Sequence, residues 1–283
     1  MKKIILIIGI AFLSSSCSKK LYNVEKAVTV PVIDGDQTEW PVNTIRSNNN
    51  INYAIQQDQD NLYLMVSSFD EQIMKKIMLL GMTYWVSTEG KHSKDQGISF
   101  PEGIVNSDAI KQKFKSLKGS ARDGFRGRGD MGSMPNINKN ILPDQSELLE
   151  NFKSQSENIS LINFDGYEVG QKIDFNRNAL DFQSLGILFD SKLVPGHSFT
   201  FEIAIPKRLL KKSTKSKKDT WAIGITTNNS NIDLRLPDSS KLDKLPARFK
   251  NRYGVSGKIE KLNELKAILE PIQFWVDMSV LKK

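Results

Sequence analysis

Two of the four tryptophans fall on the polar side of a strand that the sequence predicts. Side chains alternate between the two faces of a strand, so Trp85 shares a face with Thr83 and Ser87. By the same alternation, Trp275 shares a face with Asp277. An indole that reaches solvent can stack on a sugar ring, while neighbouring polar groups bind the sugar hydroxyls. Trp85 and Trp275 are therefore the candidate ligand-binding residues. The alternative is that both make packing contacts between strands or beneath an insertion.

The other two tryptophans are expected in the interior. Trp221 is in register with Ile223 and Ile225, which predicts a core position. Trp40 directly follows a turn, and we expect it to close one end of the fold.

Two polar turns carry oxygen ligands of the kind that calcium uses. The first contains Asp34 and Asp36, and the second contains Asp58 and Asp60. Because Ca²⁺ binds carboxylate oxygens, a structural calcium ion is one interpretation of these four residues, although neither turn has EF-hand spacing. The alternative is turn chemistry, in which Asp side chains accept hydrogen bonds from their own backbone. No other cofactor is predicted.

No catalytic constellation is recognisable, and the chain is not predicted to be an enzyme. His92 and His197 each follow a turn, with no nucleophilic serine motif or metal-ligand spacing beside them. Residues 127–132 fit a dinucleotide-binding pattern, but no strand precedes them. Catalytic carboxylates stay open, because their separation is a spatial property. A haem ligand also stays open, since the chain has eight methionines.

The amino-terminal residues have the pattern of a lipoprotein signal peptide. A basic start, the apolar run Ile4 to Leu13 and three serines precede Cys17, which is the only cysteine. The apolar run is too short to span a membrane, which takes roughly 20 residues. We therefore expect a signal peptide at residues 1–16, a lipid on Cys17 and a tether at residues 17–27. Ser14 stands where a lipobox has an aliphatic residue, so the alternative is an ordinary secretory peptide.

The charge of the chain is compatible with a membrane surface as a partner. Lys and Arg number 40 against 32 Asp and Glu, and loss of the signal peptide leaves 38 basic residues and a formal charge of +6. Basic residues crowd positions 207–218, which predicts a solvated loop or contact with anionic headgroups. No nucleic-acid partner is expected for an exported protein. Ser18-Lys19-Lys20 has neither an Asp retention signal nor an acidic export signal. The expected location is the cell envelope, on the periplasmic face of the outer membrane.

Short strands dominate the remainder of the chain. A hairpin is expected where residues 51–56 and 62–66 flank a polar turn. The pattern of residues 71–80 predicts a helix that ends at Gly81. Few helices and irregularly spaced strands favour a mostly β fold, an antiparallel β-sandwich with a few short helices. Further strands are expected at residues 27–33, 82–88, 97–101, 159–164, 185–189, 198–205, 220–227 and 272–278.

One insertion is predicted inside a single β-sandwich domain that covers residues 28–283. Residues 106–158 change to Lys-rich and Ser-rich sequence and contain a patch of Gly and Arg. Such a composition buries little apolar area, so we expect a mobile insertion. Within it, Ser146 to Phe152 has the pattern of a short helix capped by Ser146.

Several short motifs occur in an order that resembles a known family. They are Ile33 to Trp40, Tyr53, Asp60 to Leu64, Phe199 to Pro206 and Trp221 to Asn228. Together these resemble carbohydrate-binding module family 9-like (DOMON-like) domains, and residues 80–86 and 97–101 are similar to lipoproteins of Bacteroidetes-type bacteria. The resemblance implies a β-sandwich and suggests a sugar ligand held between two Trp residues. Related sandwiches hold other ligands, including haem.

These observations leave two hypotheses of function. In the first, a non-catalytic envelope lipoprotein binds a carbohydrate through Trp85 and Trp275. In the second, the chain is a structural or protein-interaction lipoprotein of the outer membrane without a sugar ligand, and the same surface meets another envelope protein. The first hypothesis requires that the two indoles reach solvent on one shared face.

Overall fold

The computed structural model describes residues 22, 24, 27, 29–113, 142–164, 171–211, 220–230 and 255–280. The predicted signal peptide with Cys17, the middle of the predicted insertion and much of the basic segment lie outside these ranges. Within them, no helix has the length and apolar character needed to span a membrane.

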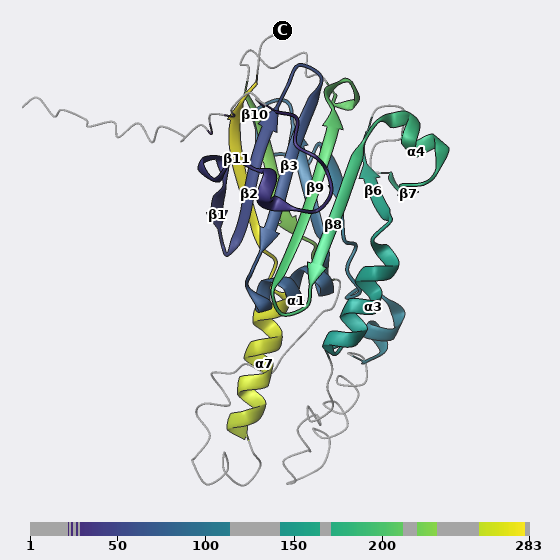
Figure 1. Cartoon of the computed structure of the whole chain (residues 1–283). Helices are drawn as coiled ribbons and strands as arrows, with labels where there is room; N and C mark the ends of the chain where they lie inside the picture. Colours follow the sequence, from purple (N-terminus) through teal and green to yellow (C-terminus); the bar gives the residue numbers. More distant parts are fainter. Residues whose placement is uncertain are drawn as a thin grey trace, which may run out of the picture.

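One sheet contains five antiparallel strands in the order β1-β2-β3-β9-β8 (Figure 1). β2 and β3 form the predicted hairpin. Their turn is fixed by Asp58, whose Oδ1 accepts hydrogen bonds from the backbone N–H groups of Asp60 and Asn61 at 2.8 and 2.6 Å. The strands are β1 (Arg46–Asn48), β2 (Ile51–Gln57), β3 (Asn61–Ser68), β8 (Leu188–Val194) and β9 (Ser198–Pro206).

The second sheet contains six antiparallel strands in the order β11-β10-β4-β5-β6-β7. Because β10 is paired with β4 on one side and β11 on the other, segments from the middle and the end of the chain lie side by side. The strands are β4 (Met82–Ser87), β5 (Gln96–Ser99), β6 (Asn158–Ile162), β7 (Lys172–Asn176), β10 (Thr220–Thr227) and β11 (Gln273–Ser279).

Tyr22 joins the edge of the six-stranded sheet beyond β11. Its backbone forms a parallel bridge to Met278, and its N–H donates to the carbonyl of Asp277 at 2.7 Å. Its phenol donates to the carbonyl of Thr44 at 2.6 Å. The first described residue of the chain therefore lies at this edge.

Helices α1, α3 and α7 lie at one end of the sandwich (Figure 1). α1 begins after Asp70, whose carboxylate accepts hydrogen bonds from the first turn, and ends at Gly81 with φ of 77°, a conformation that favours glycine. The helix turns Met74, Ile77 and Leu80 into the core. The helices are α1 (Glu71–Leu80), α3 (Gln145–Gln155), α4 (Leu180–Leu185) and α7 (Val255–Leu269), with 3-10 turns η1 (Gln37–Glu39), η2 (Val42–Thr44) and η3 (Lys207–Leu209).

Aromatic rings fill the space between the two sheets. The ring of Tyr84 on β4 stacks on Phe201 of β9, with centroids 4.8 Å apart, and Phe201 also stacks on Phe100 at 4.8 Å. All three side chains are buried. Burial of each such side chain contributes about 2 to 3 kcal/mol, so these contacts hold the sheets face to face. The expected antiparallel β-sandwich with a few short helices is confirmed.

A second apolar cluster closes the outer face of the five-stranded sheet. Trp40 packs there against Tyr63, Met65 and Ala204 and is 1% exposed. Its indole N–H donates to Oε1 of the buried Glu202 at 2.6 Å. This position corrects the expectation that Trp40 closes one end of the fold. The segment that carries Trp40 folds across the outer face of the five-stranded sheet.

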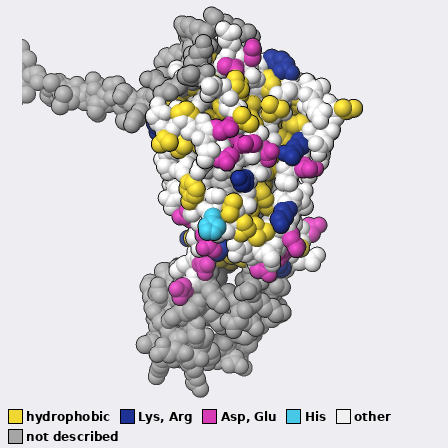
Figure 2. All heavy atoms as spheres, in the orientation of Figure 1, with side chains coloured by type: hydrophobic (Ala, Val, Ile, Leu, Met, Phe, Trp, Pro, Cys, Tyr) yellow, Lys and Arg dark blue, Asp and Glu magenta, His cyan; other side chains and the backbone are white. Residues whose placement is uncertain are grey.

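Glu202 also fixes the loop that carries Trp40. Its Oε2 accepts hydrogen bonds from the backbone N–H groups of Asp34 and Gly35 at 3.1 and 2.9 Å. Burial raises the pKa of Glu202 to about 6, although its three hydrogen bonds act in the opposite direction. Figure 2 views the molecule from this side, where acidic side chains gather near the middle among scattered hydrophobic ones.

Several sequence expectations on local structure differ from the model. The expected strand at 27–33 is not formed over residues 29–33; among its described residues, Ala27 donates a backbone hydrogen bond to Gln57 on β2. Residues 180–185 form α4, so the strand expected at 185–189 begins only at Leu188. The helix predicted inside the insertion exists, but Asp144 caps it.

The insertion is only partly described. Its middle, residues 114–141, lies outside the described residues, so its mobility stays a prediction. The part that is described packs on the body of the fold, because Leu148 and Phe152 of α3 enter the core. The strand β7 and the helix α7 were not predicted.

The buried carboxylate of Glu202 predicts a pH-dependent stability. Its pKa of about 6 in the folded state exceeds the ordinary value of 4.5, so the folded chain binds more protons between these values. The free energy of unfolding should therefore fall by about 2 kcal/mol in total as pH rises from well below 4.5 to well above 6, with most of the fall between these two values. Glu202→Gln should remove this slope in urea unfolding measured across the range. Glu264→Gln, an exposed carboxylate on α7, is the control, and an unchanged slope in Glu202→Gln would contradict the assignment.

Candidate functional site

The two candidate tryptophans lie on the outer face of the six-stranded sheet. Trp85 is on β4 and Trp275 is on β11, and the intervening strand β10 presents Gly224 opposite both of them. Each indole is half-buried. Because paired residues stand at the same level of a sheet, the two indoles and Gly224 form one row across the strands. Strand alternation correctly placed both tryptophans on the face turned away from the core.

Two glycines make room for the indole rings on this face. A β-carbon at Gly224 would lie 2.8 to 2.9 Å from three atoms of the Trp275 ring, so only hydrogen fits there. Gly97 on β5 is paired with Trp85, and a β-carbon at Gly97 would lie 2.8 Å from two atoms of the Trp85 ring. A glycine within a strand often marks such a close approach. Each indole therefore closely approaches the backbone of the neighbouring strand.

Hydrogen bonds also fix the plane of Trp85. Its Nε1–H donates to Oγ1 of Thr226 at 3.0 Å, and Thr226 in turn donates to the carbonyl of Thr83 at 3.3 Å. Thr83 donates to Oδ1 of Asn228 at 2.6 Å. The indole is thus held both by the glycine beneath it and by its own N–H.

Residues of the loop between β4 and β5 contact both indoles. The His92 ring stacks on Trp275 with centroids 5.3 Å apart and an interplanar angle of 5°. His92 Nε2 lies 2.9 Å from Oδ1 of Asp277, which holds the imidazole in place. Lys94 places its ammonium 5.6 Å from the centre of the Trp85 ring. His92 and Lys94 are both exposed side chains of a surface loop. The indoles are therefore shielded by this loop and not by core packing.

A second row of polar side chains runs beside the tryptophan row. Strand pairing places one polar residue of each of the six strands at this level. The four in the middle are buried and the two at the ends are exposed. Hydroxyl groups therefore form the floor of the face, and an amide and a carboxylate stand at its rims. The row is Gln273, Thr226, Thr83, Ser99, Ser160 and Asp174.

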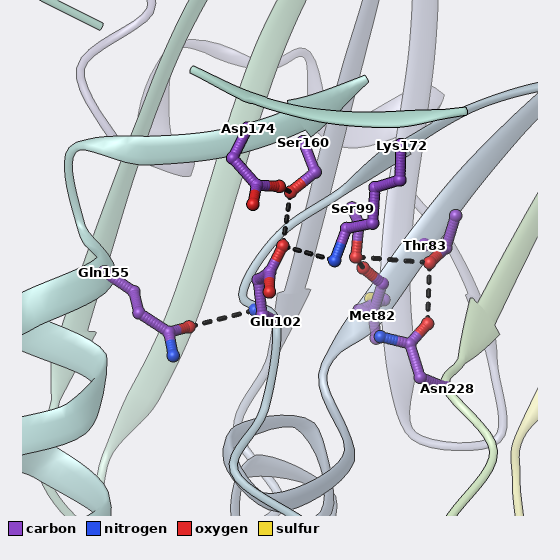
Figure 3. Close-up of polar contacts among 9 residues, drawn as sticks. All are labelled: Met82, Thr83, Ser99, Glu102, Gln155, Ser160, Lys172, Asp174 and Asn228. Atoms are coloured by element: carbon purple, nitrogen blue, oxygen red, sulfur yellow. Dashed lines mark hydrogen bonds and ion pairs between the residues drawn. The ribbon is translucent and has the colours of Figure 1, made fainter. Parts of the chain in front are cut away.

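Four charged or hydroxyl side chains meet at the β7 end of this row (Figure 3). The ammonium of Lys172 lies 2.5 Å from Oε1 of Glu102. The Ser160 hydroxyl bonds to Glu102 and lies 2.5 Å from Oδ1 of Asp174. The backbone N–H of Glu102 donates to Oε1 of Gln155 at 3.0 Å, which connects the cluster to α3. These carboxylates supply strong hydrogen-bond acceptors at one rim of the face.

The predicted calcium ligands take part in turns. Asp34 Oδ1 accepts from the N–H of Asp36, and Asp36 Oδ1 accepts from Thr38. Asp58 fixes the β2–β3 turn. Within the described ranges, no three His, Cys, Asp or Glu side chains are placed to hold a metal ion. Turn chemistry accounts for these hydrogen bonds; calcium binding at Asp34, Asp36, Asp58 and Asp60 stays a prediction.

Other expectations are placed as follows. Trp221 is half-buried against the core, with the Lys207 ammonium 6.0 Å from its ring centre. His197 lies in the β8–β9 turn. Cys17, the predicted site of lipid attachment, lies outside the described residues.

Sequence reasoning missed the residues that complete the face. His92 and Lys94 belong to a loop that no periodic pattern ties to a tryptophan. The glycines inside the predicted strands, Gly97 and Gly224, were the available signal, because glycine is disfavoured in a strand interior unless another group approaches closely.

Comparison with known proteins gives distant similarities only. No family model matches the chain, and no curated protein matches it. Among solved structures, a carbohydrate-binding module family 9 from Caldicellulosiruptor kristjanssonii in complex with cellotriose is 14% identical, covers 74% of this chain and 76% of that chain, and has a TM-score of 0.31. The same module in complex with glucose is 13% identical, covers 75% of this chain and 79% of that chain, and has a TM-score of 0.29. Neither similarity assigns a role to a residue of this chain.

Proposed function

We propose that this protein is a non-catalytic module that binds a saccharide on the outer face of its six-stranded sheet. The observation that carries the proposal is the pair of half-buried indoles on one row of the sheet, each in close contact with a glycine of the next strand. Core packing does not require this arrangement, since both rings are on the face turned away from the core. A flat, supported indole is the surface on which the apolar face of a pyranose stacks.

The polar groups around the indoles match the other requirement of a sugar. Sugar hydroxyls need both donors and acceptors at the edge of the stacking surface. Asp277 offers carboxylate oxygens beside Trp275, and Lys94 offers donors beside Trp85. Lys172 and Asp174 are exposed at the far rim. The mixture of charges favours a neutral ligand over a polyanion.

The imidazole of His92 occupies the position that a sugar on Trp275 would take. It is a flat ring parallel to the indole, so it acts as an internal substitute for the ligand. A sugar that stacks there displaces His92, whose side chain is 40% exposed and held by the single partner Asp277 on this side. Because the β4–β5 loop is exposed, this displacement leaves the core unchanged.

A second candidate function follows from the same covering residues. If His92 and Lys94 stay on the indoles, the face offers polar and charged groups to another protein of the envelope. This is the structural or protein-interaction lipoprotein without a sugar ligand. Co-purification of one envelope partner, combined with no glycan binding, would favour it.

The proposed location is the cell envelope, through a lipid on Cys17. The pattern of residues 1–17 supports this proposal. Several acyl chains give lasting attachment, whereas one gives only marginal attachment. The periplasmic face of the outer membrane is the proposed side.

Substitution of either indole tests the saccharide site. Trp85→Ala and Trp275→Ala should each weaken any glycan that the wild type binds by at least about tenfold, because truncation of a central aromatic contact typically costs 2 kcal/mol or more. Calorimetric titration of the chain from Ser18 onward against a glycan panel measures this. Trp221→Phe, on the other side of the sheet, is the control. The proposal fails if the panel gives no binding, or if both variants bind like the wild type.

Removal of the covering imidazole should strengthen binding. His92→Ala frees the outer face of Trp275, so a glycan no longer has to break a ring stack worth about 0.5 to 1.5 kcal/mol. We expect a three- to tenfold gain in affinity, at about 1.4 kcal/mol per tenfold, measured with the same titration. His197→Ala is the matched control in a distant turn. A loss of affinity in His92→Ala would show instead that the imidazole contacts the ligand.

Metabolic labelling with a fatty acid tests the anchor. The wild-type chain expressed in a bacterial host that processes lipoproteins should take up label, and Cys17→Ala should not. Ser16→Ala, which keeps the thiol and a small residue at the cleavage site, is the control and should still be labelled. Wild-type protein without label would rule out the lipid anchor.

A further inference from the structure

We infer that the imidazole of His92 is a pH-dependent cover of Trp275, which is held on the indole when it is protonated and leaves it more readily when it is neutral. The inference rests on the proposed function and adds the regulation of that site. Saccharide binding should therefore weaken as pH falls from 8 to 5. Histidine is the side chain that ordinarily changes its charge in this range.

The first step is the pair of contacts that the imidazole makes. Its ring is parallel to the indole of Trp275, with centroids 5.3 Å apart, and its Nε2 lies 2.9 Å from Oδ1 of Asp277. A positive charge on the imidazole strengthens both contacts, because the face of an indole attracts cations and a carboxylate is negative. The side chain of Asp277 is 13% exposed and that of His92 is 40% exposed, so water screens this charge pair only in part.

The second step is the balance of the other charges near the imidazole. In its own loop, Glu89 forms an ion pair with Lys91 at 2.9 Å, and Asp95 accepts hydrogen bonds from two serines. The strand β10 has no charged side chain, and β11 contributes Asp277. The segment after η3 contacts the loop through a hydrogen bond from Thr88 to a backbone carbonyl. The positive residues of these elements, which oppose protonation, are Lys91, Lys94 and Lys211.

The third step is that the backbone on both sides of the imidazole is held in place. On one side, Gly90 packs so closely on Thr220 that a β-carbon at Gly90 would lie 2.7 Å from the Thr220 hydroxyl oxygen. On the other side, the hydroxyl of Ser93 donates to Asp95 at 2.7 Å, and the N–H of Ser93 donates to the carbonyl of Lys91 at 2.9 Å. The imidazole can therefore leave the indole by rotation of its own side chain, without movement of the loop.

The fourth step is the competition between the imidazole and a saccharide for one face of Trp275. A saccharide binds there only when the imidazole has left, so every interaction that holds the imidazole on the indole lowers the affinity for the sugar. The affinity should be lowest where the imidazole is charged, rise as pH increases from 5 to 8, and then level off. An exposed ion pair and an exposed cation–π contact are each weak, so we expect a total change of about three- to tenfold.

Nuclear magnetic resonance of the ligand-free chain tests the cover directly. The chain has two histidines, and His197→Gln assigns the ring signals of His92. The ring current of Trp275 displaces these signals, so their difference between the wild type and Trp275→Ala at the same pH measures the stack. We expect this difference to be larger at pH 5 than at pH 8. A difference that is equal at both pH values, or smaller at pH 5, overturns the inference.

Calorimetric titration of the chain from Ser18 onward at pH 5, 6, 7 and 8 measures the effect on binding. The probe is cellotriose, or the tightest ligand of the glycan panel if cellotriose does not bind. The wild type should bind about three- to tenfold more weakly at pH 5 than at pH 8. His92→Phe keeps a flat ring on the indole but carries no charge, so its affinity should not change with pH.

Two further variants control for other groups that change charge in the same range. His197→Gln removes the second histidine, which lies in a distant turn, and should keep the dependence on pH. Burial raises the pKa of Glu202 to about 6, but this residue belongs to the other sheet. Glu202→Gln should therefore keep the dependence as well. Urea unfolding at each pH checks that every variant is folded.

The outcomes separate this inference from the proposed function. If the affinity of the wild type is the same at every pH, or if His92→Phe keeps the dependence, charge does not control the cover and the saccharide site stands. If no glycan binds at any pH, the proposed function fails. The resonance measurement then decides alone whether charge holds the imidazole on Trp275.

Discussion

The outer face of the six-stranded sheet depends on two glycines, whose side chains are single hydrogen atoms. Gly224 and Gly97 leave room for the indoles of Trp275 and Trp85, each of which comes from the adjacent strand. A larger residue at either position would push the ring off the sheet by contact with atoms less than 3 Å away. The positions of both indoles, and with them the contacts of the covering loop, depend on these two close approaches.

The opposite sheet shows the converse arrangement. There the chain before β1 folds across the outer face, and its indole, Trp40, is buried and bonded to Glu202. A buried carboxylate with three N–H donors is costly to desolvate, but it is hard to replace, because only a charged acceptor satisfies all three donors. One outer face of the sandwich is therefore closed by the chain itself. The other keeps its aromatic groups near solvent.

Much of the fold could be predicted from local pattern. Local apolar runs or periods, bounded by turn residues, predicted β2, β3, β9, β10 and β11, and the helix α1 with its Gly81 terminus. The strand β7, which reads Lys-Ile-Asp-Phe-Asn, has only two apolar residues and was missed. The apolar residues before the first turn failed as a strand, since Val30 and Val32 are exposed and have no partner strand.

The candidate site could be predicted only in half. Alternation alone placed Trp85 and Trp275 on a polar face. Their common row required the pairing of β10 with both β4 and β11, which joins residues far apart in the chain. Long-range register of this kind is set by the packing of the whole sandwich and leaves no local pattern. The stacking of His92 on Trp275 depends on the same register and was invisible for the same reason.

The bridge between Tyr22 and β11 has a consequence for how the site would meet a ligand in the envelope. Tyr22 is five residues after Cys17, and a chain of that length reaches at most about 18 Å. If Cys17 carries a lipid, the Met278 end of the strand that holds Trp275 stays within about that distance of the bilayer. Binding to glycans on the same surface would then be governed by local effective concentration, so weak intrinsic affinity would suffice for high occupancy. Glycans that extend far from the membrane would be reached only by their nearest segments.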